Sequence, residues 1–366
     1  MSINKVIISG GGSGGHIFPA IAIANRIKLE YPNADILFIG AEGKMEMTKV
    51  PEAGYKIEGL WISGLQRRLT VKNLALPFKL MASLLKARKI IKKFNPDVVI
   101  GVGGYASAPT LKIASMLKIP TIVQEQNSYP GKTNKMLSKS VTKICVAYDK
   151  LDRFFPANKI EFTGNPVRKK VVEIEGLRDK AFSFFKLNPN KKTILVVGGS
   201  LGAKTLNESF VDQLQTLQEK EIQLIWQCGG YQFEEMKSRT TEMNMQGIVL
   251  TEFINEMELA YAAADLIISR AGAIAISELC IVGKPIILVP SPNVAEDHQT
   301  KNAMALVDDG AAIFISDREA RVKLVPRTLE LLGNTSVQNK LSENILKKAI
   351  SNADERIVNV AKNIIS

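Results

Sequence analysis

The sequence predicts an α/β protein of two domains, each built on a parallel β-sheet. Its 366 residues, 46% of them hydrophobic, are many for one core and sufficient for two. Short β-branched runs alternate with helical patterns along the whole chain. A glycine-rich turn follows such a run in each half, at residues 10–16 and 198–203, and precedes a helix. We therefore expect two nucleotide-binding-type domains that face one cleft.

The expected strands are continuous apolar runs, which is typical of parallel sheets covered by helices on both faces. In the first half they are residues 5–9, 36–39, 98–101, 121–124 and 143–146. In the second half they are residues 193–197, 222–226, 247–250, 266–269, 285–289 and 311–315. Turn-forming residues from Thr163 to Arg168 separate the halves. An amphipathic segment from Ser342 to Ile365 fits either half.

Composition limits the location of the protein. No run approaches the roughly 20 apolar residues that span a bilayer, and the apolar run at the start is too short for a signal peptide. Cys145, Cys228 and Cys280 are odd in number and far apart, so we expect buried thiols rather than disulfides or a zinc site. These features indicate a reducing, cytosolic environment.

The net charge of +12 is concentrated in one segment. No acidic residue lies between Glu58 and Asp97, and the stretch between Arg67 and Lys93 combines nine basic residues with many apolar ones. This pattern predicts a basic amphipathic surface for an anionic membrane leaflet. For residues 86–93, a helix packed on the domain with a solvated lysine face is the alternative. Nucleic acid is disfavoured, because aromatic residues are few and no binding motif is present.

The first glycine-rich turn supports two interpretations. Gly10, Gly12 and Gly15 match the dinucleotide pattern, and Glu42 after the next strand is placed to bind a ribose, so an NAD-dependent dehydrogenase is one alternative. His16 follows the glycines directly. The dipole at a helix N-terminus favours the neutral imidazole, which suits a general base. A histidine that only caps its helix is the other alternative.

Further candidates in the first half follow later strands. Residues 101–107 include Gly103, Gly104 and Tyr105, and residues 130–135 include Thr133 and Asn134. Backbone N–H groups and side-chain donors at the carboxyl edge of a sheet can bind sugar and phosphate oxygens. These residues are candidates for binding a sugar or a phosphate group, although residues 101–107 alone also fit a plain strand-to-helix turn.

The second half offers groups for a nucleotide. Ser200 lies in the glycine-rich turn and Arg168 near the junction, where both can bind a diphosphate. Small residues from Ala271 onward open a helix N-terminus to a ligand, and Glu278 can accept two ribose hydroxyls. Residues 296–299 add amide and carboxylate groups. No metal-ligand spacing occurs, so no cofactor or metal site is expected, while a divalent cation that accompanies the substrate stays open.

Seven motifs in order, from Val6 to Ala312, resemble the MurG family, the peripheral-membrane N-acetylglucosaminyltransferases of peptidoglycan synthesis. They are GGGSGGHIFPAIAIA, GVGGYASAP, EQNSYPGKTNK, TGNPVR, GGSLGAKTLN, RAGAIAISE and EDHQTKNA. The resemblance implies a GT-B fold with two Rossmann-like domains and an interdomain cleft. Residues 1–163 would form the acceptor and membrane domain, residues 164–341 the UDP-GlcNAc domain, and residues 342–366 a helix that packs back on the first.

The resemblance also implies an activity and its setting. N-acetylglucosamine moves from UDP-GlcNAc, a substrate, to the muramyl 4-hydroxyl of undecaprenyl-diphospho-MurNAc-pentapeptide, with inversion. This step converts lipid I to lipid II on the cytoplasmic face of the cell (inner) membrane. Cell-wall synthesis and division proteins are the implied partners. Another GT-B glycosyltransferase with a lipid acceptor, such as a diacylglycerol glycosyltransferase, and a non-catalytic lipid-binding module are the alternatives.

The resemblance assigns site residues, with His16 as the candidate base. Those implied for the donor are Ser13, Gly14, Gly15, Asn127, Arg168, Ser200, Ile254, Ala273, Ile274, Ala275, Ile276, Ser277, Glu278 and Gln299. The chain departs from the common pattern at three positions. Ser13 replaces threonine and keeps the hydroxyl, while Ala271 and His298 replace a serine and a glutamine. The change at His298 leaves open which side chain there contacts the sugar.

Overall fold

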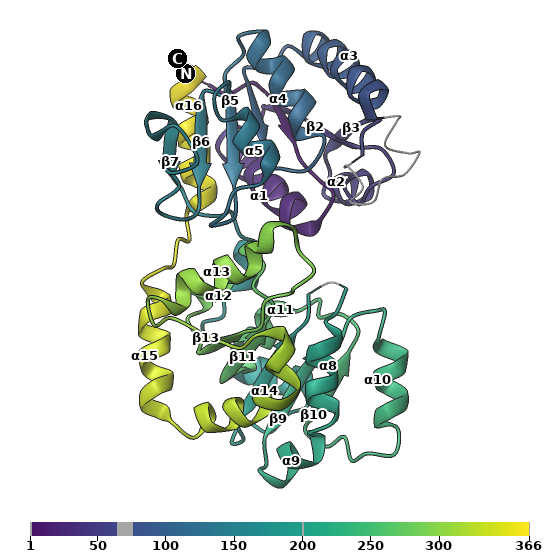
Figure 1. Cartoon of the computed structure of the whole chain (residues 1–366), viewed down its shortest axis with the longest axis vertical. Helices are drawn as coiled ribbons and strands as arrows, with labels where there is room; N and C mark the ends of the chain where they lie inside the picture. The colour runs from purple at the N-terminus through teal and green to yellow at the C-terminus, as the bar shows by residue number, and fades with distance from the viewer. Residues whose placement is uncertain (1, 64–75, 200, 366) are drawn as a thin grey trace. The chain divides into compact units, whose positions relative to one another are not determined.

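The structure, a computed structural model, describes residues 2–63, 76–199 and 201–365. The chain divides into two compact units: an N-terminal unit of Met1–Val167 with Asn352–Ser366, and a C-terminal unit of Arg168–Ser351. Each unit contains one parallel sheet between two layers of helices (Figure 1). This arrangement confirms the predicted α/β class.

The sheet of the N-terminal unit has the order β3-β2-β1-β4-β5-β6-β7. Its strands are β1 (Lys5–Ser9), β2 (Asp35–Ala41), β3 (Lys56–Leu60), β4 (Val98–Gly101), β5 (Thr121–Glu125), β6 (Lys143–Val146) and β7 (Ile160–Phe162). Ser9 at the end of β1 pairs with Ile39 of β2 on one side and Gly101 of β4 on the other. The strand order therefore reverses between β1 and β4, and ligands of open α/β sheets bind at the carboxyl ends of such strands.

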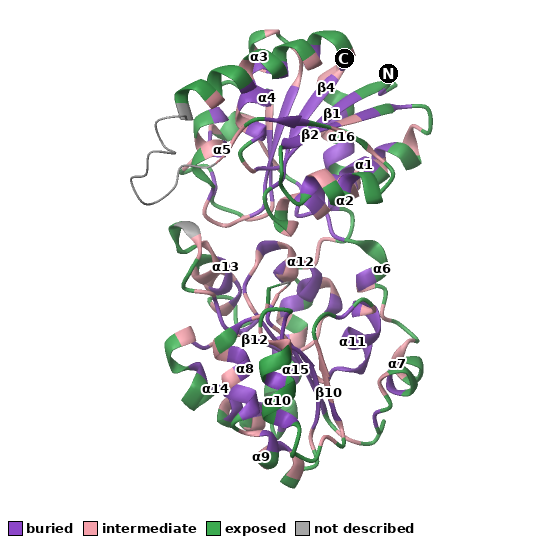
Figure 2. Ribbon diagram, turned by 90° about the vertical axis from the view of Figure 1, so that its right-hand side faces the viewer, coloured by how far each residue is buried: buried purple, intermediate pink, exposed green. Residues whose placement is uncertain are grey.

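Helices cover both faces of this sheet. They are α1 (Gly14–Glu30), α2 (Glu46–Glu52), α3 (Leu76–Phe94), α4 (Ser107–Met116), α5 (Lys132–Leu137), the 3₁₀-helix η2 (Ala157–Lys159) and α16 (Ala353–Ile365). One core lies between the sheet and α1, α2 and α16, and a second lies between the sheet and α3, α4 and α5. The strands lie inside and the outer helix faces are exposed (Figure 2).

The sheet of the C-terminal unit has the order β10-β9-β8-β11-β12-β13. Its strands are β8 (Thr193–Val197), β9 (Gln223–Gln227), β10 (Ile248–Thr251), β11 (Leu266–Ser269), β12 (Ile286–Leu288) and β13 (Ile313–Phe314). Val197 of β8 pairs with Gln227 of β9 and with Ser269 of β11. The order reverses between β8 and β11, so the loops at 198–203 and 270–272 leave the sheet at the equivalent point.

Two helix layers also cover the second sheet. The helices are α6 (Lys169–Val172), α7 (Arg178–Phe185), α8 (Lys204–Val211), α9 (Leu214–Glu219), α10 (Phe233–Thr240), α11 (Met257–Ala263), α12 (Ala273–Val282), η3 (Ala295–Asp297), α13 (His298–Val307), α14 (Asp317–Leu332) and α15 (Thr335–Leu346). Helices α7, α11 and α12 pack on one face, and α8, α10 and α14 on the other.

All eleven predicted strands are present within one or two residues of their predicted ends. Two further strands, β3 and β7, were not predicted. Both lie at the edges of the first sheet, and their polar residues, Lys56, Glu58 and Glu161, interrupt the apolar run on which the prediction depended. An edge strand is buried less completely, so its sequence carries a weaker signal.

The amphipathic segment that ends the chain contains two helices rather than one. The first, α15, packs on α12 and α14 in the C-terminal unit, whereas α16 packs on α1 in the N-terminal unit. Ser351 and Asn352, which are exposed, lie between them. The segment that the sequence presented as one amphipathic stretch is thus divided between the two units.

The three cysteines are buried and free, as the sequence predicted. Burial raises the pKa of the Cys145 and Cys280 thiols to about 12 and that of Cys228 to about 11. Thiolate, the reactive form, is therefore scarce at neutral pH. Within the described ranges, no helix combines the length and apolar character needed to cross a membrane.

Candidate active site

The glycine loop of residues 10–13 lies between β1 and α1. Ser13 is the extended N-cap of α1, and Gly14 and Gly15 form its first turn. The N–H group of Gly12 donates to Oε2 of Glu46 at 2.8 Å. The carboxylate of Glu46 thus occupies an N–H group that the pyrophosphate of a dinucleotide would need. Glu42, the candidate ribose-binding acid, is paired with Lys86 at 3.0 Å. These contacts argue against the dehydrogenase alternative.

His16 lies in the first turn of α1, and its ring is bonded to the glycine loop. Its Nδ1 lies 3.0 Å from the carbonyl oxygen of Gly11. A carbonyl oxygen only accepts hydrogen bonds, so this contact requires the proton on Nδ1 and, in the neutral ring, a lone pair on Nε2. A histidine that caps its helix would accept from the free N–H groups of the first turn. Nδ1 of His16 instead bonds to the carbonyl oxygen of Gly11 in the loop.

The loop between β4 and α4 packs against the first glycine loop. A Cβ atom on Gly104, whose φ is +86°, would lie 2.4 Å from the carbonyl oxygen of Gly11. A Cβ atom on Gly103 would lie 2.7 Å from Nε2 of His16. The structure therefore brings His16, Gly103 and Gly104 together, and only glycine permits this approach. Tyr105 is about half exposed beside them.

Glu125 at the end of β5 organises the third polar loop. Its buried carboxylate accepts hydrogen bonds from N–H and Nδ2 of Asn127, from N–H of Gly131 and from Nδ2 of Asn134, at 2.8–3.2 Å. Thr133 is half-buried in α5. Oδ1 of Asn134 is buried and has no hydrogen-bond partner. Because unpaired buried acceptors are rare, this atom is a candidate contact for a ligand donor.

The glycine loop at residues 198–203 joins β8 to α8. Gly202, with φ of +79°, packs against the next loop so tightly that a Cβ atom would lie 2.1 Å from the carbonyl oxygen of Cys228. Gln227 donates to the carbonyl oxygen of Gly199 at 3.0 Å. The hydrogen bond from Gln227 thus attaches the loop to the end of β9. Ser200, a predicted diphosphate ligand, lies outside the described residues.

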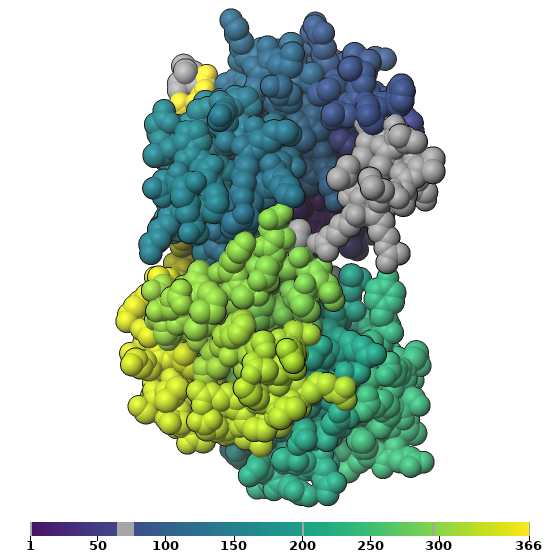
Figure 3. Space-filling model, in the orientation of Figure 1, coloured from purple at the N-terminus to yellow at the C-terminus, as the bar shows by residue number. Residues whose placement is uncertain are grey.

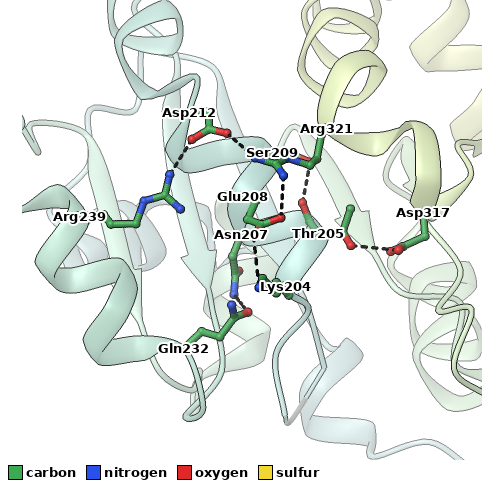
Figure 4. Close-up of polar contacts among 10 residues, drawn as sticks. All are labelled: Lys204, Thr205, Asn207, Glu208, Ser209, Asp212, Gln232, Arg239, Asp317 and Arg321. Atoms are coloured by element: carbon green, nitrogen blue, oxygen red, sulfur yellow. Dashed lines mark hydrogen bonds and ion pairs between the residues drawn. The ribbon is translucent and has the colours of Figure 1, made fainter.

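Polar contacts also fix α8, the helix that follows this loop (Figure 4). Asn207 is bonded to Gln232 and to the indole of Trp226, Asp212 pairs with Arg239 at 2.6 Å, and Thr205 is bonded to Asp317. These partners come from three different elements. A helix held on several sides keeps its N-terminal N–H groups in a constant position, as an anion site requires.

Glu278, on α12, is a buried carboxylate of the C-terminal unit. Its Oε1 lies 3.4 Å from Nη2 of Arg168, and its Oε2 accepts from the hydroxyl of Tyr261 at 3.4 Å. Burial raises the pKa of Glu278, while Arg168 and Tyr261 act in the opposite direction. Burial and the nearby carboxylate raise the pKa of Tyr261 well above its usual range. Two long bonds leave the carboxylate able to accept shorter ones.

The predicted small-residue run forms the N-terminal half of α12, with Gly272 as its N-cap. Ala273 is buried, and Ile274, Ala275 and Ser277 are half-buried. The side chains of Ile276 and Ile254 both lie in the hydrophobic core, at 2% and 4% exposure, so each can offer a ligand only its backbone. Among the predicted residues of this unit, Arg168 and Glu278 form an ion pair.

Gln299 lies on the first turn of α13, next to His298. Its Oε1 accepts from N–H of Ser291 at 2.9 Å, which ties the helix to the preceding loop. Glu296 and Asp297, directly before this helix, have φ of +56° and +49°. Two successive non-glycine residues in the left-handed region store backbone strain, which is often found at ligand-binding sites.

The basic apolar segment is described from Leu76 onward, and Arg67, Arg68 and Lys72 lie outside the described residues. Helix α3 buries a stripe of Ser83, Ala87 and Ile91 against its unit. Phe78, Met81 and Leu85 remain 73%, 59% and 62% exposed, and the exposed Lys86, Arg88, Lys89, Lys92 and Lys93 follow. The side chains of α3, dark blue in Figure 3, lie at the surface. The helix packs on its domain and also presents an apolar, basic face.

Glu46 and Tyr261 were not singled out from the sequence, although each bonds to a predicted site residue or its loop, whereas Glu125 begins the motif EQNSYPGKTNK. Glu125 directly follows the predicted strand of residues 121–124, which is a usable signal. The positions of Glu46 and Tyr261 follow from tertiary packing alone. Among the described residues, no group of three or more histidine, cysteine, aspartate or glutamate side chains is arranged to hold a metal ion.

Comparison with protein families matches both units. Residues 6–146 match the glycosyltransferase family 28 N-terminal domain, and residues 193–357 match its C-terminal domain. Two relatives are named UDP-N-acetylglucosamine–N-acetylmuramyl-(pentapeptide) pyrophosphoryl-undecaprenol N-acetylglucosamine transferase. The one from Cytophaga hutchinsonii is 55% identical and the one from Bacteroides fragilis 53%. Both alignments span 99% of this chain, and 97% and 95% of the relative.

Solved structures agree with these matches. The chain resembles Acinetobacter baumannii MurG with a TM-score of 0.78 and 28% identity, over 98% of this chain and 99% of the other. A UDP-GlcNAc 2-epimerase from Neisseria meningitidis, bound to UDP-GlcNAc, has a TM-score of 0.66 at 15% identity, over 98% of this chain and all of the other. That likeness concerns the fold alone. With its two parallel-sheet units, its GT-B fold and full-length relatives above 50% identity, the chain belongs to the MurG family of glycosyltransferases.

Proposed function

We propose that this chain transfers N-acetylglucosamine from UDP-GlcNAc to the muramyl 4-hydroxyl of undecaprenyl-diphospho-MurNAc-pentapeptide, with inversion, converting lipid I to lipid II. The observation that carries this proposal is 55% identity over 362 residues to a transferase named for these substrates. The acceptor oxygen bonds to the anomeric carbon, the bond from that carbon to the UDP oxygen breaks, and its electron pair leaves with UDP.

The C-terminal unit is the proposed donor site. The N–H groups that begin α8 and α12 lie at the switch point of the sheet, where a diphosphate is attracted to helix N-termini. Glu278 accepts the two ribose hydroxyls, and Arg168, whose Nη2 lies 3.4 Å from that carboxylate, shares the negative charge that develops on UDP. Gln299 on α13 contacts the sugar hydroxyls.

His16 is the proposed general base. Its bond to Gly11 places the basic lone pair of the neutral ring on Nε2, and a Cβ atom on Gly103 would lie only 2.7 Å from that atom. Nε2 takes the proton of the acceptor hydroxyl as this oxygen attacks. The loops around Gly103, Tyr105, Thr133 and Asn134 supply contacts for the acceptor and its diphosphate.

Replacement of His16 tests the base. His16→Ala is expected to lower kcat by about 100-fold or more while the affinity for UDP stays unchanged, because the groups proposed for the nucleotide lie on the C-terminal unit. Steady-state kinetics and calorimetric titration with UDP measure the two quantities. A variant with the parent's kcat would remove His16 from this role.

We also propose that α3 attaches the protein to the cytoplasmic face of the membrane that holds its acceptor. Its exposed Phe78, Met81 and Leu85 can enter the headgroup region, and its lysines and arginines can bind anionic lipids. Cell-wall synthesis and division proteins stay as proposed partners at that membrane.

A vesicle assay tests the attachment. Replacing Phe78, Met81 and Leu85 by serine is expected to lower co-sedimentation with anionic vesicles by about 30-fold or more, since each side chain can bury apolar area. The matched control is Leu29→Ser, at an equally exposed apolar residue on α1 (69%). Binding that is independent of salt, of anionic lipid or of the triple change would contradict the proposal.

A further inference from the structure

Glu46, the first residue of α2, is a buried carboxylate beneath the first glycine loop. It is 1% exposed, and each of its oxygens accepts from a backbone N–H group. Oε1 accepts from Ala41 at 3.0 Å, and Oε2 accepts from Gly12 at 2.8 Å. Such charge-assisted bonds are short and strong. They fix the carboxylate in place and leave its negative charge directed at the loop.

The space that Glu46 occupies is created by two glycines. A Cβ atom on Gly11 would lie 2.1 Å from Oε1 of Glu46, and one on Gly40 would lie 2.6 Å from its Cγ. Any other residue at either position would displace the carboxylate. The local structure is therefore built around this side chain.

One peptide group connects Glu46 to His16. The N–H of Gly12 and the C=O of Gly11 belong to the same planar amide. The N–H donates to Glu46, while the C=O accepts from Nδ1–H of His16 at 3.0 Å. A carboxylate at one end of an amide polarises it and strengthens the hydrogen bond at the other end.

We propose that Glu46 is a positioning residue that acts on His16 through the Gly11–Gly12 peptide. It holds the proton on Nδ1, keeps the lone pair on Nε2 and stabilises the imidazolium that forms when Nε2 accepts a proton. An aspartate bonded directly to a histidine does this in the serine-protease triad, whereas here an amide lies between the two groups. The inference rests on the proposed role of His16 as the base.

Glu46→Gln tests this inference, because the amide keeps the size of the side chain, removes its charge and can accept from only one of the two N–H groups. We expect kcat to fall about 10-fold or more, with an unchanged KM for UDP-GlcNAc. The control is Glu52→Gln on the same helix, where the side chain is 54% exposed and pairs with Lys49. The control is expected to retain the parent's kcat. An unchanged kcat in Glu46→Gln would overturn the inference.

The ring nitrogens of His16 give a readout independent of activity. The chain has two histidines, so ¹⁵N spectra of histidine-labelled protein contain two rings, and His298→Gln assigns them. In the parent, the neutral His16 ring is expected to carry its proton on Nδ1; in Glu46→Gln, the Nε2–H form should gain population. The same tautomer in both proteins would mean that Glu46 supports only the fold of the loop, which overturns the inference.

The double variant separates this inference from the proposal on which it rests. If Glu46 acts through His16, then His16→Ala with Glu46→Gln has the same kcat as His16→Ala alone, because the losses are not additive. Additive losses would overturn the inference. If His16→Ala alone keeps the parent's kcat, the base assignment fails, while the ring spectra still report whether Glu46 sets the tautomer.

Discussion

At the carboxyl group of Glu278, burial and ion pairing act on the pKa in opposite directions. Burial is the larger effect, so the pKa is raised despite Arg168 and Tyr261. The folded protein therefore holds this proton more tightly than the unfolded chain does. The contribution of this group to the free energy of unfolding is complete below the usual range of a glutamate carboxyl, and it is lost as pH rises through the raised pKa.

Glu278→Gln should accordingly separate stability from binding. We expect the free energy of unfolding to fall less steeply with pH above about pH 4.5 than in the parent, since the titrating group is gone. Affinity for UDP should drop by about 1–3 kcal/mol, because ribose hydroxyls lose an anionic acceptor. Urea unfolding across pH and calorimetric titration measure the two effects.

Glu235→Gln, at an exposed carboxyl of the same unit, is the control for that change. It should leave UDP affinity as it is. A pH slope of Glu278→Gln identical to the parent's, or equal UDP affinities, would contradict the corresponding half of the prediction.

Single residues were predictable from sequence where they stand in a recognisable motif. His16, Arg168 and Glu278 lie in the motifs GGGSGGHIFPAIAIA, TGNPVR and RAGAIAISE, so their chemical type and position were informative. Glu46 and Tyr261 could not be found in this way. Their partners are 34 and 17 residues distant in sequence, and only packing shows that the atoms meet.

Among the elements, the glycine loops pack so closely on neighbouring backbone that a Cβ atom at Gly104 or Gly202 would clash. Gly104 and Gly54 have the same φ of +86°, but they differ in surroundings. A Cβ atom on Gly104 meets the carbonyl of Gly11, whereas one on Gly54 meets nothing within 4 Å. Comparing the two glycines therefore separates the free-energy cost of a side chain in the left-handed conformation from the cost of a steric clash.

Alanine at these two positions should have unequal effects. Gly54→Ala is expected to lower the free energy of unfolding by about 1 kcal/mol, for the conformation alone. Gly104→Ala should cost at least about 2 kcal/mol more and reduce kcat, since it moves the loop that contacts Gly11. Urea unfolding and kinetics of both variants provide the comparison. Equal losses of unfolding free energy in the two variants would show that the loop around Gly104 moves to accommodate a Cβ atom without strain.

The sequence predicted buried strands better than edge strands and helix ends. A strand inside a parallel sheet is apolar on both faces, so composition alone identifies it. Strand β3 alternates lysine and glutamate with apolar residues at the sheet edge, and the pattern there is indistinct. The division of the last amphipathic segment into α15 and α16 depends on which unit each helix covers, which periodicity does not encode.

At the scale of the whole molecule, the two ends of the chain share a core. Ile357, Val358 and Ala361 of α16 are fully buried among residues of β1, β2 and α1. Arg26 of α1 pairs with Glu355 at 3.3 Å. The N-terminal unit therefore needs a segment that follows the entire C-terminal unit in sequence.

Ile357→Ala should destabilise the N-terminal unit by about 2–5 kcal/mol, through the cavity that it leaves. The C-terminal unit, whose core lacks this residue, should keep its own unfolding transition and its UDP affinity. Calorimetric scans with and without UDP distinguish the two transitions, because the ligand stabilises only the unit that binds it. Asn359→Ala, exposed on the same helix, is the control. A shift of both transitions would contradict the assignment.

The position of α16 also orders events during synthesis on the ribosome. Translation proceeds at about 5–20 residues per second, and domains generally fold as they emerge, N-terminal first. Here residues 168–351 are made before α16 is available, so the second unit can fold while the first still exposes the surface that α16 covers. A chain released early would present that apolar surface to chaperones and proteases. The late helix thus makes completion of the first core conditional on synthesis of the second.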